Sequence, residues 1–144
     1  MAMLAAFMTL ACSRGKPAWQ GPRVVFSPEA LSHLPEAVVL MTRIPPPPYW
    51  TPSPSEIESA ETALSRLSDP PFLDFGRQYF GFTIDGRRVV QVRGFCERYF
   101  SAVRDPQWER TPVLLLDAGA CAFLADVDTN SGDVRSFEWG TAGP

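Results

Sequence analysis

The clearest helical spacing of hydrophobic residues in this chain follows Ser53. The apolar positions are three or four residues apart, which places them on one helix face: Ile57, Ala60, Leu64 and Leu67. Ser53-Pro54-Ser55-Glu56 supplies a capping hydroxyl, a proline for the first turn and a glutamate that can reach back to the cap. Asp69-Pro70-Pro71 ends the pattern, because a residue that precedes proline leaves the α region. We therefore predict an amphipathic helix.

Beyond this helix the hydrophobic residues alternate with polar ones, as they do in strands. Residues 77–84 and 88–96 flank Asp85-Gly86, which is a strong hairpin signal. A two-residue turn would pair Phe82 with Val89 and mix the two faces, so we expect a three-residue loop with Gly86 as a bulge residue. The core face of that register holds Phe80, Phe82, Val90, Val92 and Cys96. Its opposite face holds Tyr79, Thr83, Val89, Gln91 and Arg93.

A second pair of strands is predicted at residues 112–117 and 120–127, with a last strand at 134–139. One face of the middle strand carries Cys121, Phe123, Ala125 and Val127. Residues 97–110 connect the two pairs, and the sequence does not assign them to a helix or a strand. The predicted fold is α+β, with one amphipathic helix packed on a four-stranded, mostly antiparallel sheet.

The segment before the helix is rich in proline: ten of the fifteen prolines lie within the first 54 residues. Four consecutive prolines, Pro45 to Pro48, favour polyproline II. We interpret residues 13–52 as an extended leader and spacer, and the alternative is a ligand for a proline-binding groove. The predicted organisation is a signal-like segment at 1–12, this spacer, and a single α+β domain at 53–144.

The N-terminus resembles an export signal. Met3 to Ala11 is an apolar run with the length of a signal-peptide core, and it is far shorter than the roughly 20 residues that span a bilayer. Thr9-Leu10-Ala11-Cys12 resembles a bacterial lipobox, although Thr9 stands at the usual leucine position. Cys12 is therefore the predicted lipidation site, and the bacterial cell envelope, lipid-anchored or secreted, is the predicted location. The alternative is a plain tail on a cytoplasmic protein.

Composition narrows the chemistry. A net charge of -3 gives no basis for binding nucleic acid. The only histidine is His33, so neither a zinc site nor an activated cysteine is expected, and no cofactor is predicted. Asp126, Asp128 and Asn130 alternate as calcium ligands do, but glycine and glutamate are missing from the positions that an EF-hand requires, so we predict a hairpin turn.

With Cys12 set aside, Cys96 and Cys121 form an even pair. A disulfide between them would close a loop of about 26 residues, worth roughly 3.5 kcal/mol in the chain-entropy model. Such a bond requires an oxidising compartment. The alternative is two buried free thiols on a shared core face.

The order of several short motifs resembles a group of small uncharacterised bacterial secreted proteins and lipoproteins. The motifs are Arg77-Gln78-Tyr79-Phe80-Gly81, Ile84-Asp85-Gly86-Arg87-Arg88-Val89-Val90, Phe95-Cys96, and Asp117-Ala118-Gly119-Ala120-Cys121-Ala122-Phe123. The resemblance covers residues 53–143. It implies a helix, an Asp-Gly hairpin that ends in Phe-Cys, and a Gly-x-Cys-x-Phe strand in an exported protein. It implies no activity.

Three hypotheses for function follow. The first is a binding or inhibitory module, anchored to the envelope or secreted, that holds a protein partner on an open sheet face bearing Tyr79, Val89, Gln91 and Arg93. The second is an enzyme whose acid and base are scattered carboxylates, such as Asp74, Asp117 and Glu138. The third is a structural envelope protein. No single residue stands out as catalytic.

Overall fold

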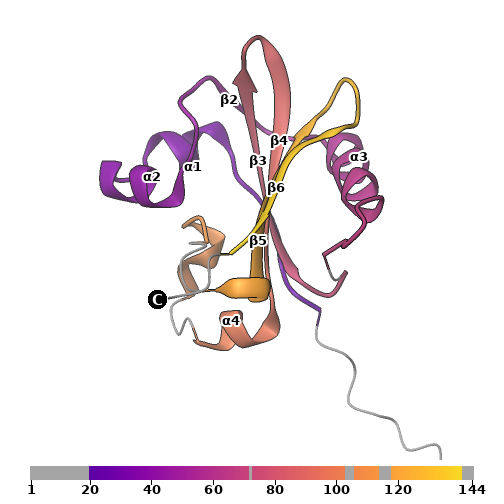
Figure 1. Cartoon of the computed structure of the whole chain (residues 1–144). Helices are drawn as coiled ribbons and strands as arrows, with labels where there is room; N and C mark the ends of the chain where they lie inside the picture. Colours follow the sequence, from indigo (N-terminus) through magenta and orange to yellow (C-terminus); the bar gives the residue numbers. More distant parts are fainter. Residues whose placement is uncertain (1–19, 72, 103–105, 114–117, 141–144) are drawn as a thin grey trace, which may run out of the picture.

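The computed structural model describes residues 20–71, 73–102, 106–113 and 118–140, and these form an α+β fold with a mixed six-stranded sheet (Figure 1). The strand order is β1-β3-β4-β5-β6, and β2 also pairs with β3. Helix α3 lies on one face of the sheet, and α1 and α2 lie on the other. The predicted α+β class is confirmed, and the sheet gains two strands, β1 and β2, from the segment that was predicted to be a spacer.

The elements have the following bounds. The strands are β1 (Arg23–Val25), β2 (Tyr49–Trp50), β3 (Gly76–Ile84), β4 (Arg87–Phe95), β5 (Ala122–Asp128) and β6 (Val134–Trp139). The helices are α1 (Pro28–Ser32), α2 (Glu36–Thr42), α3 (Pro54–Ser65) and α4 (Glu97–Ala102), with 3₁₀ turns at Pro106–Glu109 and Gly119–Cys121. Residues 114–117 of the strand predicted at 112–117 lie outside the described residues, and residues 112–113 are not in a strand.

Helix α3 forms as its sequence predicts. The Ser53 hydroxyl accepts a hydrogen bond from the Glu56 backbone N–H at 3.4 Å, and the Glu56 carboxylate accepts one from the Ser53 N–H at 2.8 Å. Ala60 and Leu64 are buried against Val90 and other core residues of the sheet. The helix begins and packs where the capping box and the apolar stripe place it.

The register of the β3–β4 hairpin differs from the one expected. The turn has two residues, with Asp85 at φ 50° and Gly86 at φ 74°, and Phe82 pairs with Val89. Two central residues with positive φ match the twist of the strands, and an Asp-Gly pair tolerates that conformation. The predicted bulge, which would pair Phe80 with Val90, is therefore wrong.

In the observed register both faces of the hairpin are buried. Tyr79 packs with Val90 beneath α3, whereas Phe80 and Val89 pack with Phe26 beneath α1. A strand that is covered on both sides does not need to separate apolar from polar residues. The two-residue turn does place apolar residues on both faces, but in this fold both faces are buried, so this arrangement is not destabilising.

The second cover comes from residues that were predicted to form the spacer. Strand β1 pairs with β3 in parallel, with Val25 opposite Tyr79, and β2 pairs with β3 antiparallel, with Tyr49 opposite Phe82. The side chains that fill this face include Phe26, Leu31 and Ile44. For residues 20–52 the extended leader is therefore a wrong prediction, because their scattered apolar residues complete the core. Residues 1–19, with Cys12, lie outside the described residues.

Proline does not prevent this packing, because it occurs where a helix tolerates it. Pro28 occupies the first turn of α1, where its missing N–H would have no partner within the helix. The Ser27 hydroxyl accepts a hydrogen bond from the Ala30 N–H at 3.2 Å and caps the helix. The segment thus contains a local helix signal, Ser27 followed by Pro28, but its high proline content favoured an extended chain.

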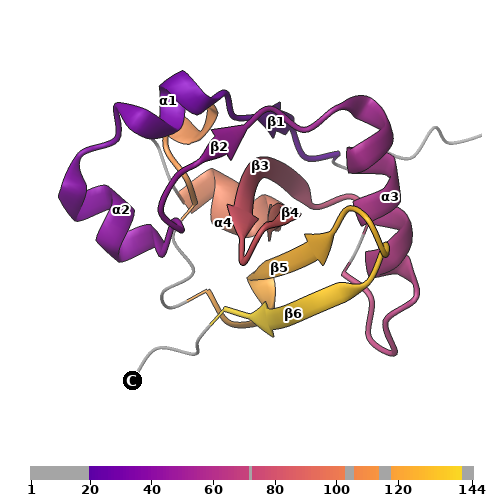
Figure 2. The same cartoon turned by 90° about the horizontal axis from the view of Figure 1, so that it is seen from above.

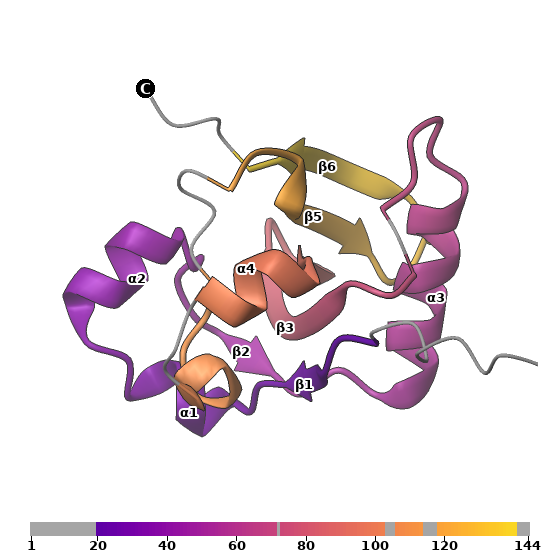
Figure 3. The ribbon, with the colours of Figure 1, turned by 90° about the horizontal axis from the view of Figure 1, so that it is seen from below.

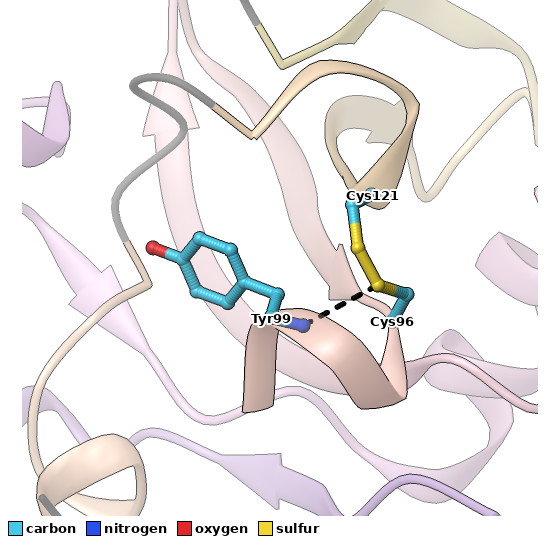
Figure 4. The surroundings of a disulfide bond; sticks show 3 residues. All are labelled: Cys96, Tyr99 and Cys121. Carbon is cyan, nitrogen blue, oxygen red and sulfur yellow. Dashed lines mark hydrogen bonds between the residues drawn. A yellow bond between two sulfur atoms is a disulfide. The ribbon is translucent and has the colours of Figure 1, made fainter. Parts of the chain in front are cut away.

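The disulfide between Cys96 and Cys121 is present (Figure 4). It joins the end of β4 to the turn before β5, with the two Cα atoms 5.0 Å apart. The Cys96 N–H also donates to the Cys121 carbonyl at 2.8 Å, and the Tyr99 N–H lies 3.4 Å from the Cys96 sulfur. Helix α4 begins directly after Cys96, at the end of the sheet that the bridge closes (Figure 3).

Gly94 shows how tightly the α3 side of the sheet is packed. It lies opposite Phe123, and a Cβ atom at this position would come within 1.9 Å of a Phe123 ring carbon. We expect Gly94→Ala to lower the free energy of unfolding by about 1–3 kcal/mol, because the ring must shift within a packed core. Urea unfolding measures the change. The double variant with Phe123→Leu should lose less than the sum of the two single losses, and additive losses would contradict this contact.

Candidate functional site

A cleft lies over β5 and β6, on the same side of the sheet as α2. The helices on this side pack on β3 and β4, through a cluster with Phe26, Phe80 and Val89. Beyond them is a cleft of about 310 Å³. Its lining residues are Arg43, Pro45, Gln91, Leu124, Asp126, Ser136, Phe137 and Glu138. Charged, amide and hydroxyl groups therefore gather beside the apolar cluster of this face.

A row of three polar side chains crosses the floor of the cleft from strand to strand. Gln91, Asp126 and Ser136 are register partners in β4, β5 and β6. The Gln91 amide donates to Asp126 Oδ1 at 3.0 Å, and the Ser136 hydroxyl donates to Asp126 Oδ2 at 3.1 Å. Each carboxylate oxygen is therefore oriented by a neutral donor. Among the described residues, no cation forms an ion pair with Asp126.

The buried guanidinium of Arg93 lies behind this row. Its Nε and Nη2 donate to Gln91 Oε1 at 3.0 and 2.8 Å, and its Nη1 donates to the Val113 carbonyl at 3.0 Å. Nη2 also donates to the carbonyl of Thr42, the last residue of α2. Burial lowers the pKa of Arg93, while the charge of Asp126 acts in the opposite direction. Gln91 thus links a buried positive charge to a carboxylate in the cleft.

An ion pair spans the rim of the cleft. Arg43, which ends α2 in a left-handed conformation at φ 53°, contacts the carboxylate of Glu138 on β6. The two side chains are 58% and 45% exposed, so their attraction is weak and exchangeable.

A second polar cluster is structural. Glu61 on α3 accepts hydrogen bonds from the Tyr79 hydroxyl at 2.8 Å and from Arg77 Nε at 3.1 Å, and Arg23 of β1 lies 3.5 Å away. Burial, followed by the charge of Glu61, raises the pKa of Tyr79. The cluster ties helix α3 and strand β1 to β3.

The open sheet face predicted for a protein partner does not exist. Tyr79, Val89, Gln91 and Arg93 are each at most 2% exposed, and the first of them lies on the opposite face from the others. The second cover, formed by residues 23–50, lies on the face of Val89, Gln91 and Arg93, whereas helix α3 covers Tyr79. Of the predicted set, only Gln91 lines the cleft.

The carboxylates proposed for an enzyme are not brought together. Asp74 precedes β3 and is exposed, whereas Glu138 lies on β6, with β4 and β5 between them in the sheet. Asp117 lies outside the described residues. Glu138 does line the cleft, but beside Asp126 rather than Asp74.

From the sequence, Asp126 falls in the strand predicted at 120–127 and was considered only as a calcium ligand, but one signal points to it as a site residue. Alternation puts Phe123 and Ala125 on the α3 face, so Leu124 and Asp126 must face the other way. Asp126 is therefore a carboxylate on the face of the strand opposite its apolar residues, and this position was the signal for the site. Arg43 and Ser136 had no comparable signal.

The turn after β5 is a hairpin turn, as predicted. Asp128 Oδ1 accepts hydrogen bonds from the N–H groups of Asn130 at 2.8 Å and Ser131 at 3.2 Å, and these lower the pKa of Asp128. Within the described parts of the chain, no group of His, Cys, Asp and Glu is placed to hold a metal ion.

Comparison with protein-family models, with curated proteins and with solved structures finds no match for this chain. No helix in the described ranges is long and apolar enough to cross a membrane. The disulfide is consistent with an extracytoplasmic location.

Proposed function

We propose that this domain is an extracytoplasmic binding module whose ligand places a cationic group, an ammonium or a guanidinium, against Asp126 in the cleft. The observation that carries the proposal is the carboxylate itself: both of its oxygens are oriented by Gln91 and Ser136, and no described cation pairs with it. Lipid attachment at Cys12 stays a prediction from the sequence.

The arrangement favours a cation for two reasons. An ionised carboxylate has about four acceptor positions, and two of those on Asp126 are used by neutral donors. Glu138 lines the same cleft, and its partner Arg43 is exposed, so an incoming cation can exchange for Arg43 at that carboxylate. Charge-assisted hydrogen bonds are roughly twice as strong as neutral ones, so an incoming ammonium gains more here than a neutral group does.

Binding of a lysine derivative tests this proposal. We expect Nα-acetyl-lysine methylamide to shift the amide resonances of Ser136 and Glu138 in an NMR titration. Asp126→Asn should weaken the affinity at least tenfold, because the isosteric amide keeps the shape of the site and removes its charge. Asp133→Asn, a change at an exposed turn carboxylate, is the matched control and should bind normally.

Two results would contradict the proposal. One is an unchanged affinity in the Asp126→Asn variant. The other is equal binding of the Nε-acetylated lysine derivative, which has the same backbone but carries no charge.

A further inference from the structure

Strand β6 forms one edge of the sheet, and the outward backbone groups of its regular half have no strand partner in the part of the chain that the structure describes. The Gly140 N–H donates to the Ala122 carbonyl, so alternation along the antiparallel ladder directs the backbone of Glu138 and Ser136 toward β5. The N–H and C=O groups of Phe137 and Trp139 therefore point away from the sheet. Figures 2 and 3 show β6 at the outer edge, and among the described residues no strand pairs with that side.

We propose that β6 receives an extended segment of a protein partner as an additional strand, and that a Lys or Arg side chain of this segment enters the cleft. This inference rests on the proposed function, because it names the partner that carries the cationic group. Addition of a strand to an exposed edge is a general mode of peptide recognition, in which backbone hydrogen bonds supply affinity and side-chain pockets supply specificity.

The cleft and the edge belong to the same strand. Ser136 and Glu138 line the cleft, and both lie on β6. Residues that are opposite one another in neighbouring strands project to the same face. Side chains of an added strand opposite these two residues would therefore project over the cleft.

The residues on the edge define which side chains fit. A cation opposite Glu138 competes with Arg43 for that carboxylate, and a cation opposite Ser136 lies over a small hydroxyl and near Asp126, the register partner of Ser136. On the other face, Phe137 and Trp139 are half-buried aromatic residues with ring centroids 5.2 Å apart. The matching partner segment thus alternates cationic with apolar residues.

The strand also limits where pairing can occur. A register shift between Asp126 and Val127 leaves Arg135 as an extra residue in β6, so the first half of the edge is irregular. The pairing segment is therefore Ser136 to Trp139. The opposite edge is formed by β1 and β2, which have only three and two residues.

Acetylated, amidated hexapeptides of alternating lysine and valine test the inference on the full chain. The parent peptide should bind. It should also slow hydrogen exchange at the amides of Phe137 and Trp139, because these two N–H groups point away from the sheet and would be bonded to the peptide. Two further peptides carry backbone N-methyl groups, one on every lysine and the other on every valine. Alternate residues of a strand direct their N–H groups to opposite sides, so only one of these two should lose binding, by at least tenfold.

The outcomes separate this inference from the proposed function. If both methylated peptides bind as tightly as the parent, or both lose binding equally, strand addition is wrong. In that case the cleft proposal stands provided that Asp126→Asn still weakens the parent peptide. If neither the parent peptide nor the lysine derivative binds, both proposals fail. A peptide of alternating glutamate and valine is the charge control, and its binding with equal affinity would overturn the cationic assignment.

Discussion

Replacing Arg93 by alanine is expected to lower the free energy of unfolding by about 3–5 kcal/mol, as measured by urea denaturation. The guanidinium is fully buried and donates to Gln91, Thr42 and Val113. Its removal takes the donor away from three buried acceptors, which are Gln91 Oε1 and the carbonyls of Thr42 and Val113. Each buried unsatisfied group costs about 1–3 kcal/mol. It also leaves a cavity between α2 and the sheet.

Two variants make this prediction specific. Arg135→Ala removes an exposed arginine from the bulge of β6 and should change stability by about 0.5 kcal/mol or less. Arg93→Lys keeps the charge but loses the planar fork, so its loss should fall between the other two. A loss below about 1 kcal/mol for Arg93→Ala would show that the network does not hold α2 in place.

Reduction of the disulfide is expected to cost the domain roughly 3.5 kcal/mol, because the bond closes a loop with a sequence separation of 25 residues. Most small domains have only about 5–15 kcal/mol of stability, so the reduced protein should unfold at a markedly lower urea concentration. Unfolding with and without dithiothreitol measures the difference. The double variant Cys96→Ala, Cys121→Ala should reproduce the reduced state.

Cys12 supplies the control for this experiment. Cys12→Ala should leave the stability and its response to dithiothreitol unchanged, because the bridge joins the other two cysteines. Peptide mapping of the oxidised protein should recover a linked pair containing Cys96 and Cys121. A linked peptide that contains Cys12, or stability that does not respond to reduction, would contradict the pairing.

Elements that depend on neighbouring residues were predicted well. The capping box at Ser53 and the apolar stripe of α3 are local signals, and the helix forms from them as expected. The last strand was predicted at residues 134–139, which are the observed bounds of β6. The cysteine pair was also identified, because the two residues lie at strand ends that the predicted sheet can bring together.

Elements that depend on distant residues were predicted poorly. Phe26, Leu31 and Ile44 are separated by prolines and show no clear period, so only their common contact with the sheet reveals them as core. That contact in turn decides the hairpin register. Once both faces of β3 are covered, the preferred geometry of the Asp85-Gly86 turn prevails over the separation of polar from apolar residues.

The sequence by itself determined the α+β class, helix α3, the final strand and the cysteine pair, because capping, alternation and spacing act over a few residues. Only the tertiary structure decided that residues 23–50 cover the second face, and that Arg93 is buried. It alone brought Arg43, Asp126 and Glu138 to one cleft. These residues come from three separate elements, and their proximity follows from strand order and register, which no local pattern specifies.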